Sequence, residues 1–200
     1  MYRREMERGH LPSRDTELIQ IVDSALAEAT RKSGEWLVCR PGCSQCCVGV
    51  FAINQLDATR LKTGLAELEK HEPARAARIR ERARDSAERL SSQFPDGKFS
   101  EFVDSELADH EPCPVLDPEA GRCELYESRP MTCRVFGPPV QSEGGLGVCE
   151  LCFHGASDEQ IAACEMKPDP DDLESTLNEE VEHRTGLSGS TTIAHVLRPD

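Results

Sequence analysis

The sequence predicts a mainly α-helical protein, a small helical domain around an irregular cysteine-rich centre. Three observations predict it. Apolar residues recur at helical spacing on both sides of the centre, residues 112–152 are rich in Pro, Gly and Cys without that periodicity, and ten of the 200 residues are cysteines. Hydrophobic residues make up 38% of the chain and aromatic residues 4%, so apolar burial alone would leave the fold marginally stable.

Spacing and end signals place the predicted helices. Residues 16–33 carry apolar side chains along one helical face, and Gly34 is the predicted stop. Asn54 stands three residues before Asp57, which is typical of a capped helix start. Pro73 opens a further helix that reaches roughly Gln93. Shorter helices are predicted at residues 99–112, 157–166, 171–184 and 191–197.

Composition predicts three segments along the chain. They are an N-terminal helical segment (1–34), a cysteine-cluster metal-binding domain with inserted helices (35–155) and an acidic C-terminal helical segment (156–200). The formal net charge of −14 argues against nucleic acid as a partner, because nucleic acid selects for Lys and Arg. The arginines of residues 73–93 are interspersed with Glu81, Asp85 and Glu88, which is typical of a solvated helix face with ion pairs.

The sequence also indicates a compartment. No stretch approaches the ~18 consecutive apolar residues of a membrane helix, and no apolar run follows the basic residues of the first dozen positions, as it would in a secretory signal. We therefore expect a cytoplasmic protein without a membrane partner. In that reducing compartment, clustered cysteines are more often metal ligands or redox groups than disulfides.

Four thiols lie within nine residues in the first cysteine group, which reads Cys39-Arg-Pro-Gly-Cys43-Ser-Gln-Cys46-Cys47. Its turn residues allow the sulfurs to face one ion at about 2.3 Å. The side chains of the neighbours Cys46 and Cys47 tend to diverge. That favours two metals, different irons of one cluster, or one metal ligand and one core residue, and a vicinal disulfide is a further alternative.

Five more clustered cysteines follow, at Cys113, Cys123, Cys133, Cys149 and Cys152. Cys113 and Cys123 flank a Pro- and Gly-containing loop, as the arms of a hairpin-like knuckle would, and Cys149 and Cys152 form a CxxC pair. Nine clustered cysteines exceed one four-thiolate site and suit two sites, or one cluster and one site.

Three residues near these groups have open roles. Cys164 stands alone and is either a buried thiol or a peripheral partner of the CxxC pair. His110 and His154 are either ligands or surface histidines. The sequence contains neither a nucleophile elbow nor a metallohydrolase motif, and we predict no catalytic residue.

Arginines stand close to the cysteines. Arg122 and Arg134 each adjoin one, and Arg129 stands four residues before Cys133. Thiolates bring negative charge into a partly buried place, where an unpaired charge is expensive. We expect Arg129 and Arg134 to bind the cofactor by neutralising a thiolate–metal centre and donating hydrogen bonds to sulfur. The alternative is surface pairing with acidic neighbours such as Glu124.

These motifs match a known family. The match lies in Cys39 to Cys47, in Cys113-Pro-Val-Leu, and in Cys123-Glu-Leu-Tyr-Glu-Ser-Arg-Pro-Met-Thr-Cys133-Arg-Val-Phe. On these residues the chain resembles the YkgJ-type cysteine-cluster proteins, a zinc- or iron-chelating family with a CxxCxxCC signature. In one departure from that signature, three residues rather than two separate Cys39 from Cys43. The resemblance implies a metal or iron–sulfur centre held by these cysteines, and related motifs in a flagellin lysine methylase imply an enzymatic alternative.

We therefore predict a metal-binding protein that chelates zinc or iron. Its expected ligands are Cys39, Cys43, Cys46, Cys47, Cys113, Cys123, Cys133, Cys149 and Cys152. All-sulfur ligation suits zinc or iron–sulfur and excludes magnesium or calcium as the main occupant. The adjacent pair and the excess of thiols over one zinc site favour an iron–sulfur cluster. Expected partners are metal ions and a protein that the sequence does not identify. The alternative is an iron–sulfur-dependent modifying enzyme resembling the methylase.

Overall fold

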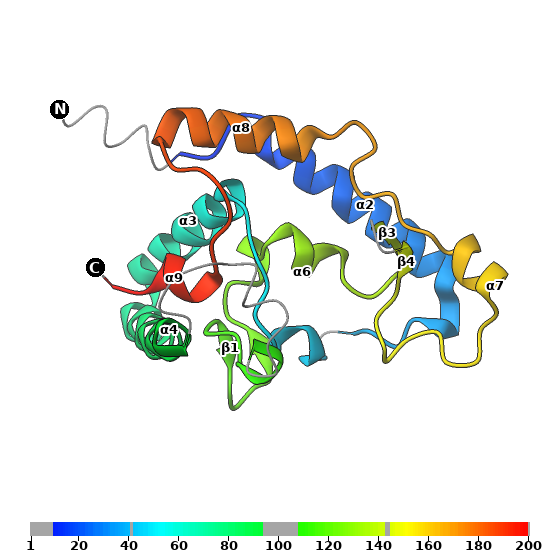
Figure 1. Ribbon diagram of the computed structural model, residues 1–200, viewed down its shortest axis with the longest axis horizontal. Coiled ribbons are helices and arrows are strands. Elements are labelled where there is room, and N and C mark those ends of the chain that lie inside the picture. Colours follow the sequence, from blue (N-terminus) through cyan, green and yellow to red (C-terminus); the bar gives the residue numbers. More distant parts are fainter. Residues whose placement is uncertain (1–9, 41, 94–107, 143–144, 200) are drawn as a thin grey trace. The chain divides into compact units, whose positions relative to one another are not determined.

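The computed structural model describes residues 10–40, 42–93, 108–142 and 145–199, and within these ranges the protein is mainly α-helical, as predicted (Figure 1). The α-helices are α2 (Asp15–Ser33), α3 (Gln55–His71), α4 (Pro73–Gln93), α6 (Met131–Val135), α7 (Asp158–Ala163), α8 (Leu173–Thr185) and α9 (Ile193–Leu197). Short 3₁₀ helices are η1 (Gly34–Trp36), η2 (Gln45–Cys47), η3 (Ala108–His110) and η4 (Tyr126–Ser128). Two antiparallel hairpins pair β1 (Leu116–Asp117) with β2 (Arg122–Cys123), and β3 (Val140–Ser142) with β4 (Gly145–Gly147).

Packing divides the chain into two compact units. Unit 1 contains the described parts of residues 1–11, 42–130 and 178–200, and unit 2 contains residues 12–41 and 131–177. The three-segment division of the sequence rests on composition and stays a prediction. None of the helices in the described ranges has the length and apolar character that crossing a membrane requires.

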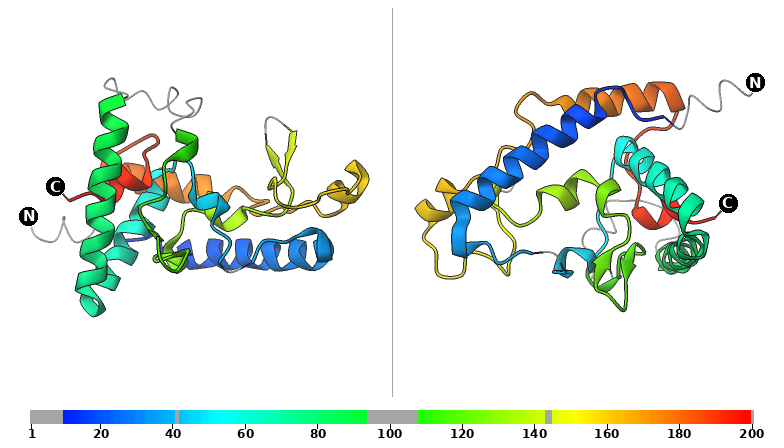
Figure 2. Two further views of the ribbon diagram at one scale, coloured as in Figure 1. Left: turned by 90° about the horizontal axis from the view of Figure 1, so that it is seen from below. Right: turned by 180° about the vertical axis from the view of Figure 1, so that it is seen from behind.

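The core of unit 1 is a group of three helices. Helix α3 packs on α4, and both pack on α9. The left view of Figure 2 shows α4 from the side. Their buried contacts include Leu61, Ile79 and Leu197. The side chain of Asn54 accepts the Asp57 N–H at 2.9 Å, which confirms the predicted helix cap.

A glycine sets how closely α3 meets η4 in unit 1. A Cβ added at Gly64 would lie 2.1 Å from Ser128 Oγ and 2.5 Å from Ser128 Cβ. Gly64 weakens the helix locally, but its missing side chain allows this close contact between two segments far apart in the sequence.

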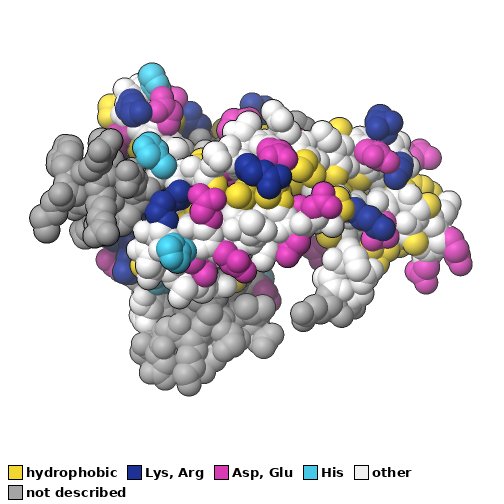
Figure 3. Space-filling view, turned by 90° about the horizontal axis from the view of Figure 1, so that it is seen from above, with side chains coloured by type: hydrophobic (Ala, Val, Ile, Leu, Met, Phe, Trp, Pro, Cys, Tyr) yellow, Lys and Arg dark blue, Asp and Glu magenta, His cyan; other side chains and the backbone are white. Residues whose placement is uncertain are grey.

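Helix α4 has the predicted bounds, and its arginines pair more widely than predicted. Arg84 bonds to Asp85 at 2.7 Å on the exposed face, as predicted. Arg89 instead reaches Glu111 at 2.7 Å. Three further arginines also reach a carboxylate beyond the helix, because acids of α3 and of the segment that carries Cys123 lie against α4. Acidic and basic side chains are mixed over the face of the described residues seen in Figure 3.

In unit 2, α2 packs on the short helix α6. Gly34 has φ +51° at the end of α2, where the sequence predicts the stop. Arg134 of α6 is buried, and its Nη1 donates to Asp23 of α2 at 3.1 Å. This ion pair, in which only the arginine is buried, ties the two helices together.

The other predicted helices are confirmed with shifted ends where the structure describes them. The predicted ranges 157–166, 171–184 and 191–197 overlap α7, α8 and α9. The helix predicted at 99–112 lies largely outside the described residues, and its last part contains the 3₁₀ helix η3.

Candidate metal centre

All ten cysteines lie within the described ranges, and none forms a disulfide. Five belong to unit 1, namely Cys43, Cys46, Cys47, Cys113 and Cys123. Five belong to unit 2, namely Cys39, Cys133, Cys149, Cys152 and Cys164. The first sequence group is therefore divided, because Cys39 belongs to one unit and Cys43 to the other.

In unit 1, the backbone joins the first cysteine group to the second. The N–H of Cys113 donates to the carbonyl of Cys47 at 2.8 Å, and the N–H of Gly49 donates to the carbonyl of Glu111 at 2.9 Å. These two bonds form an isolated antiparallel bridge between Val48 and Pro112. Cysteines more than sixty positions apart are thereby held on adjoining segments.

The β1–β2 hairpin lies where the sequence predicts a hairpin-like knuckle between Cys113 and Cys123. Leu116 pairs with Cys123 across the hairpin, and the Leu116 N–H donates to the carbonyl of Cys113 at 3.0 Å. At the tip, Asp117 Oδ1 accepts the N–H groups of Glu119 at 2.9 Å and Ala120 at 3.1 Å. Both cysteines pack against the core of unit 1, so the hairpin and the core fix their spacing.

The thiols of unit 1 influence one another. The pKa of Cys46 is raised well above its usual range, mainly by a hydrogen bond with Cys47 and secondly by burial. Burial raises the pKa of Cys113 to about 12 and also raises that of Cys123. The neighbours Cys46 and Cys47 therefore converge in η2 rather than diverge. Without a metal these thiols favour the protonated form, so that binding an ion must displace protons.

Arg129 supplies positive charge to the thiols of unit 1. It is only 8% exposed, its Nη1 donates to the carbonyl of Tyr126 at 2.8 Å, and its guanidinium carbon lies 3.9 Å from the centre of the Tyr126 ring. Its positive charge acts to lower the pKa of both Cys46 and Cys123. A fixed cation whose charge acts on two thiols from different segments supplies the charge balance that a thiolate centre needs.

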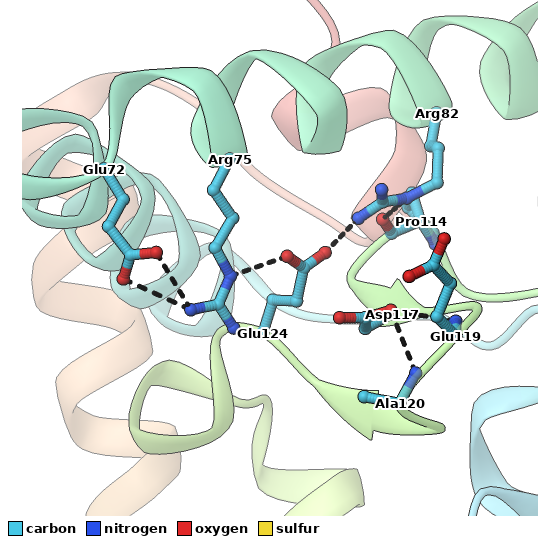
Figure 4. Close-up of polar contacts among 8 residues, drawn as sticks. All are labelled: Glu72, Arg75, Arg82, Pro114, Asp117, Glu119, Ala120 and Glu124. Atoms are coloured by element: carbon cyan, nitrogen blue, oxygen red, sulfur yellow. Dashed lines mark hydrogen bonds and ion pairs between the residues drawn. The ribbon is translucent and has the colours of Figure 1, made fainter.

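A carboxylate beside Cys123 fastens the same segments to α4 (Figure 4). The Glu124 side chain, 3% exposed, accepts from Arg75 Nε at 2.7 Å and also from Arg82 Nη2. Arg82 Nε donates to the carbonyl of Pro114 at 2.8 Å. Arg82 therefore holds residues adjacent to both Cys113 and Cys123. Sequence reasoning missed this role for Glu124, which it considered only as a surface partner of arginines near the cysteines.

In unit 2, three cysteines are buried in one apolar cluster. Cys149, Cys152 and Cys164 are 8%, 5% and 5% exposed and pack with Phe153. Cys164 is thus a buried thiol, and it packs in the same cluster as the CxxC pair. The structure places Cys133 in α6, partly buried.

The remaining predicted site residues differ in burial. Arg134 is buried and pairs with Asp23 in unit 2, whereas Arg129 lies in unit 1, so the two arginines belong to different cysteine groups. His110 and His154 are exposed.

Within the described ranges, no three His, Cys, Asp or Glu side chains are already grouped as ligands of one metal ion. The fit to a metal therefore rests on the donor chemistry: five thiols in each unit, with the charge of Arg129 acting on two of those in unit 1. Soft thiolate donors suit zinc, iron and iron–sulfur clusters. Holding one ion requires these thiols to turn toward a shared point.

Fold and thiols together define a small, mainly helical, cysteine-rich protein with the donor chemistry of a soft-metal chelator. Over residues 38–155 the chain matches the family model described as "CxxCxxCC: Putative zinc- or iron-chelating domain". The chain belongs to this family, which confirms the resemblance noted in the sequence and supports metal binding in general. No curated protein and no solved structure matched the chain.

Proposed function

We propose that the protein is a non-enzymatic metalloprotein and that unit 1 holds its principal metal centre through Cys46, Cys47, Cys113 and Cys123. The observation that carries the proposal is the joining of two distant cysteine segments by the bond from the Cys113 N–H to the Cys47 carbonyl, with the charge of the buried Arg129 acting on Cys46 and Cys123. Cys43, which lies just before η2, is the fifth thiol of unit 1 and is available as an additional ligand.

We propose an iron–sulfur cluster as the preferred occupant. Five thiols in one unit exceed the four that a tetrahedral zinc ion takes, and this excess suits a cluster that contains more than one metal ion. Such a centre would make the protein an electron carrier or a sensor. With zinc, the centre would stabilise a chain of low apolar content.

Metal analysis and absorption spectroscopy of anaerobically isolated protein test this proposal. We expect iron with inorganic sulfide and a band between about 320 and 420 nm. Colourless protein with stoichiometric zinc would overturn the iron–sulfur assignment and keep metal binding. Protein without metal, whose thermal unfolding is insensitive to a strong chelator, would overturn the proposal as a whole.

The enzymatic alternative makes a separate prediction. A cluster-dependent methylase must bind a methyl donor, so titration calorimetry with S-adenosylmethionine should give a saturable signal. We expect none, because the proposed centre carries out no group transfer. Saturable binding of S-adenosylmethionine to the metal-loaded protein would favour the modifying enzyme instead.

A further inference from the structure

Resting on the proposed function, we infer that unit 2 holds a second, independent metal centre built on Cys149, Cys152 and Cys164, with Cys39 as the fourth thiol. Cys164 lies beyond residues 38–155 that match the family, and it stands alone in the sequence. The inference therefore adds a ligand and separates the cysteines into two centres.

Burial is the first step of the argument. Cys149, Cys152, Cys164 and Phe153 make up the buried part of one cluster, with partly buried apolar residues around it. A single buried cysteine is commonly a small hydrophobic residue. Three thiols among four buried side chains instead supply soft donors suited to zinc or iron in one apolar place. Since no three of the described ligand side chains are already grouped around one ion, binding requires these thiols to turn toward a shared point.

The backbone of the CxxC pair supports the same interpretation. The N–H of Cys152 donates to the carbonyl of Cys149 at 2.8 Å, which closes a tight turn. Phe153 follows with φ +61°, a left-handed conformation that is strained for a non-glycine residue. Its N–H donates to the carbonyl of Trp36 at 2.9 Å, which holds the strained residue in place. Strain of this kind persists where the surrounding structure requires one local geometry.

The fourth thiol comes from the segment after η1. Trp36 and Leu37 pack against the cysteine cluster, and Cys39 follows two residues later. A Cβ added at Gly137 would lie 3.3 Å from Leu37 Cδ1 and 3.7 Å from Cys39 Sγ. Gly137 thus permits the close approach of this segment. Cys39 is exposed, so we propose that it turns toward the cluster when an ion binds.

Trp36 makes the inference testable, because it is the one tryptophan of the sequence and packs on this cluster. The experiment strips the full chain of metal under anaerobic conditions and titrates it with Co²⁺. Cobalt bound to thiolates absorbs visible light and quenches a nearby indole. Cobalt absorption reports on thiolate-bound metal in the whole chain. Trp36 emission reports on metal bound beside the cluster on which it packs, and the variants below assign the quenching to one set of thiols.

We expect Co²⁺ to quench Trp36 in the wild-type chain. The C152A/C164A variant should lose that quenching together with about one bound ion per chain. The matched C46A/C113A variant should lose unit 1 binding and keep the quenching. Alanine is the chosen replacement because it keeps a small apolar group in the core.

Each contrary result has a distinct meaning. Bound Co²⁺ that leaves Trp36 emission unchanged in the wild-type chain overturns the second centre and leaves the proposed function intact, and this measurement needs no variant to fold. Loss of all cobalt in either double variant shows one shared centre and also overturns the inference. Absence of any thiolate–cobalt absorption contradicts the proposed function itself.

Discussion

Units 1 and 2 carry equal numbers of cysteines and support them by different physical means. In unit 1 the support is largely ionic, since buried Glu124 pairs with two arginines and the charge of Arg129 acts on Cys46 and Cys123. In unit 2 the cluster of Cys149, Cys152 and Cys164 is apolar. Ionic support is directional, and it fails abruptly when one member is removed because the others are left uncompensated. Apolar support weakens gradually, with the size of the side chain that is removed.

The largest expected effect comes from removing the carboxylate of Glu124. Glu124→Gln leaves Arg75 and Arg82 facing a neutral amide, and we expect unit 1 to lose about 2–3 kcal/mol. This is below the full value for a buried pair because both arginines are about one-third exposed, at 32% and 28%. Urea unfolding measures the loss. We also expect faster metal release to a chelator, since both hairpin arms lose their attachment to α4.

A matched control is available on the same arginine. Glu72 also pairs with Arg75, at 3.2 Å, but its side chain is 54% exposed. We expect Glu72→Gln to change the free energy of unfolding by less than about 0.5 kcal/mol. Equal effects of the two substitutions would show that burial of Glu124 contributes nothing to the support of unit 1.

The next effect is steric. Gly64→Ala should gain about 1 kcal/mol in helix propensity, but the added Cβ overlaps Ser128 Oγ and Cβ, and the latter cannot rotate away. We expect a net loss of about 1–2 kcal/mol from the displaced η4, measured by urea unfolding. Lys62→Ala, on an exposed position of the same helix, is the control. A stabilised Gly64→Ala variant would mean that α3 and η4 are not in close contact.

A smaller effect is expected from the ion pair of unit 2. Asp23→Asn removes the partner of buried Arg134, yet the Asp23 side chain is 49% exposed. Water can therefore replace much of what the carboxylate supplies, and we expect a loss of less than about 1 kcal/mol. Hydrogen exchange of the α6 amides measures it. A loss as large as that of Glu124→Gln would remove the contrast between the units.

The smallest expected effect depends on pH. Burial, with the charge of Arg198 as a second cause, lowers the pKa of His195 in α9 of unit 1. The unfolded chain then binds a proton more readily than the folded chain, so stability falls as pH drops below about 6.5. We expect His195→Gln to flatten this slope between pH 7.5 and 5.5, measured by urea unfolding at each pH. An unaltered slope in His195→Gln would exclude this histidine as its origin.

The helices were the predictable part of the fold, because their signals are local. The apolar periodicity of residues 16–33, the cap at Asn54 and the start at Pro73 each depend on residues within one or two turns. The bounds of α4 agree with the prediction for that reason.

The grouping of the cysteines was not predictable, because it depends on contacts between distant segments. Cys39 and Cys43 are close in sequence and belong to different units, whereas Cys164 lies with Cys149 and Cys152 although no neighbouring cysteine marks it. The attachment of Glu124 to α4 likewise crosses more than forty positions. The available signal was weak: a run of arginines on one helix and an acid directly after a cysteine.

The β1–β2 hairpin has a consequence for how this protein can be modified. Cys123 is fixed by its pairing with Leu116, not by the residues of the turn at 118–121. A peptide tag inserted in that turn therefore disturbs only the contacts of Asp117 at the tip, and the distance between the two sulfur-bearing arms is preserved. One extra residue between Cys113 and Leu116 would instead turn alternate side chains to the opposite face. The turn is thus the natural attachment point for a probe, and the short stretch before β1 tolerates no change in length.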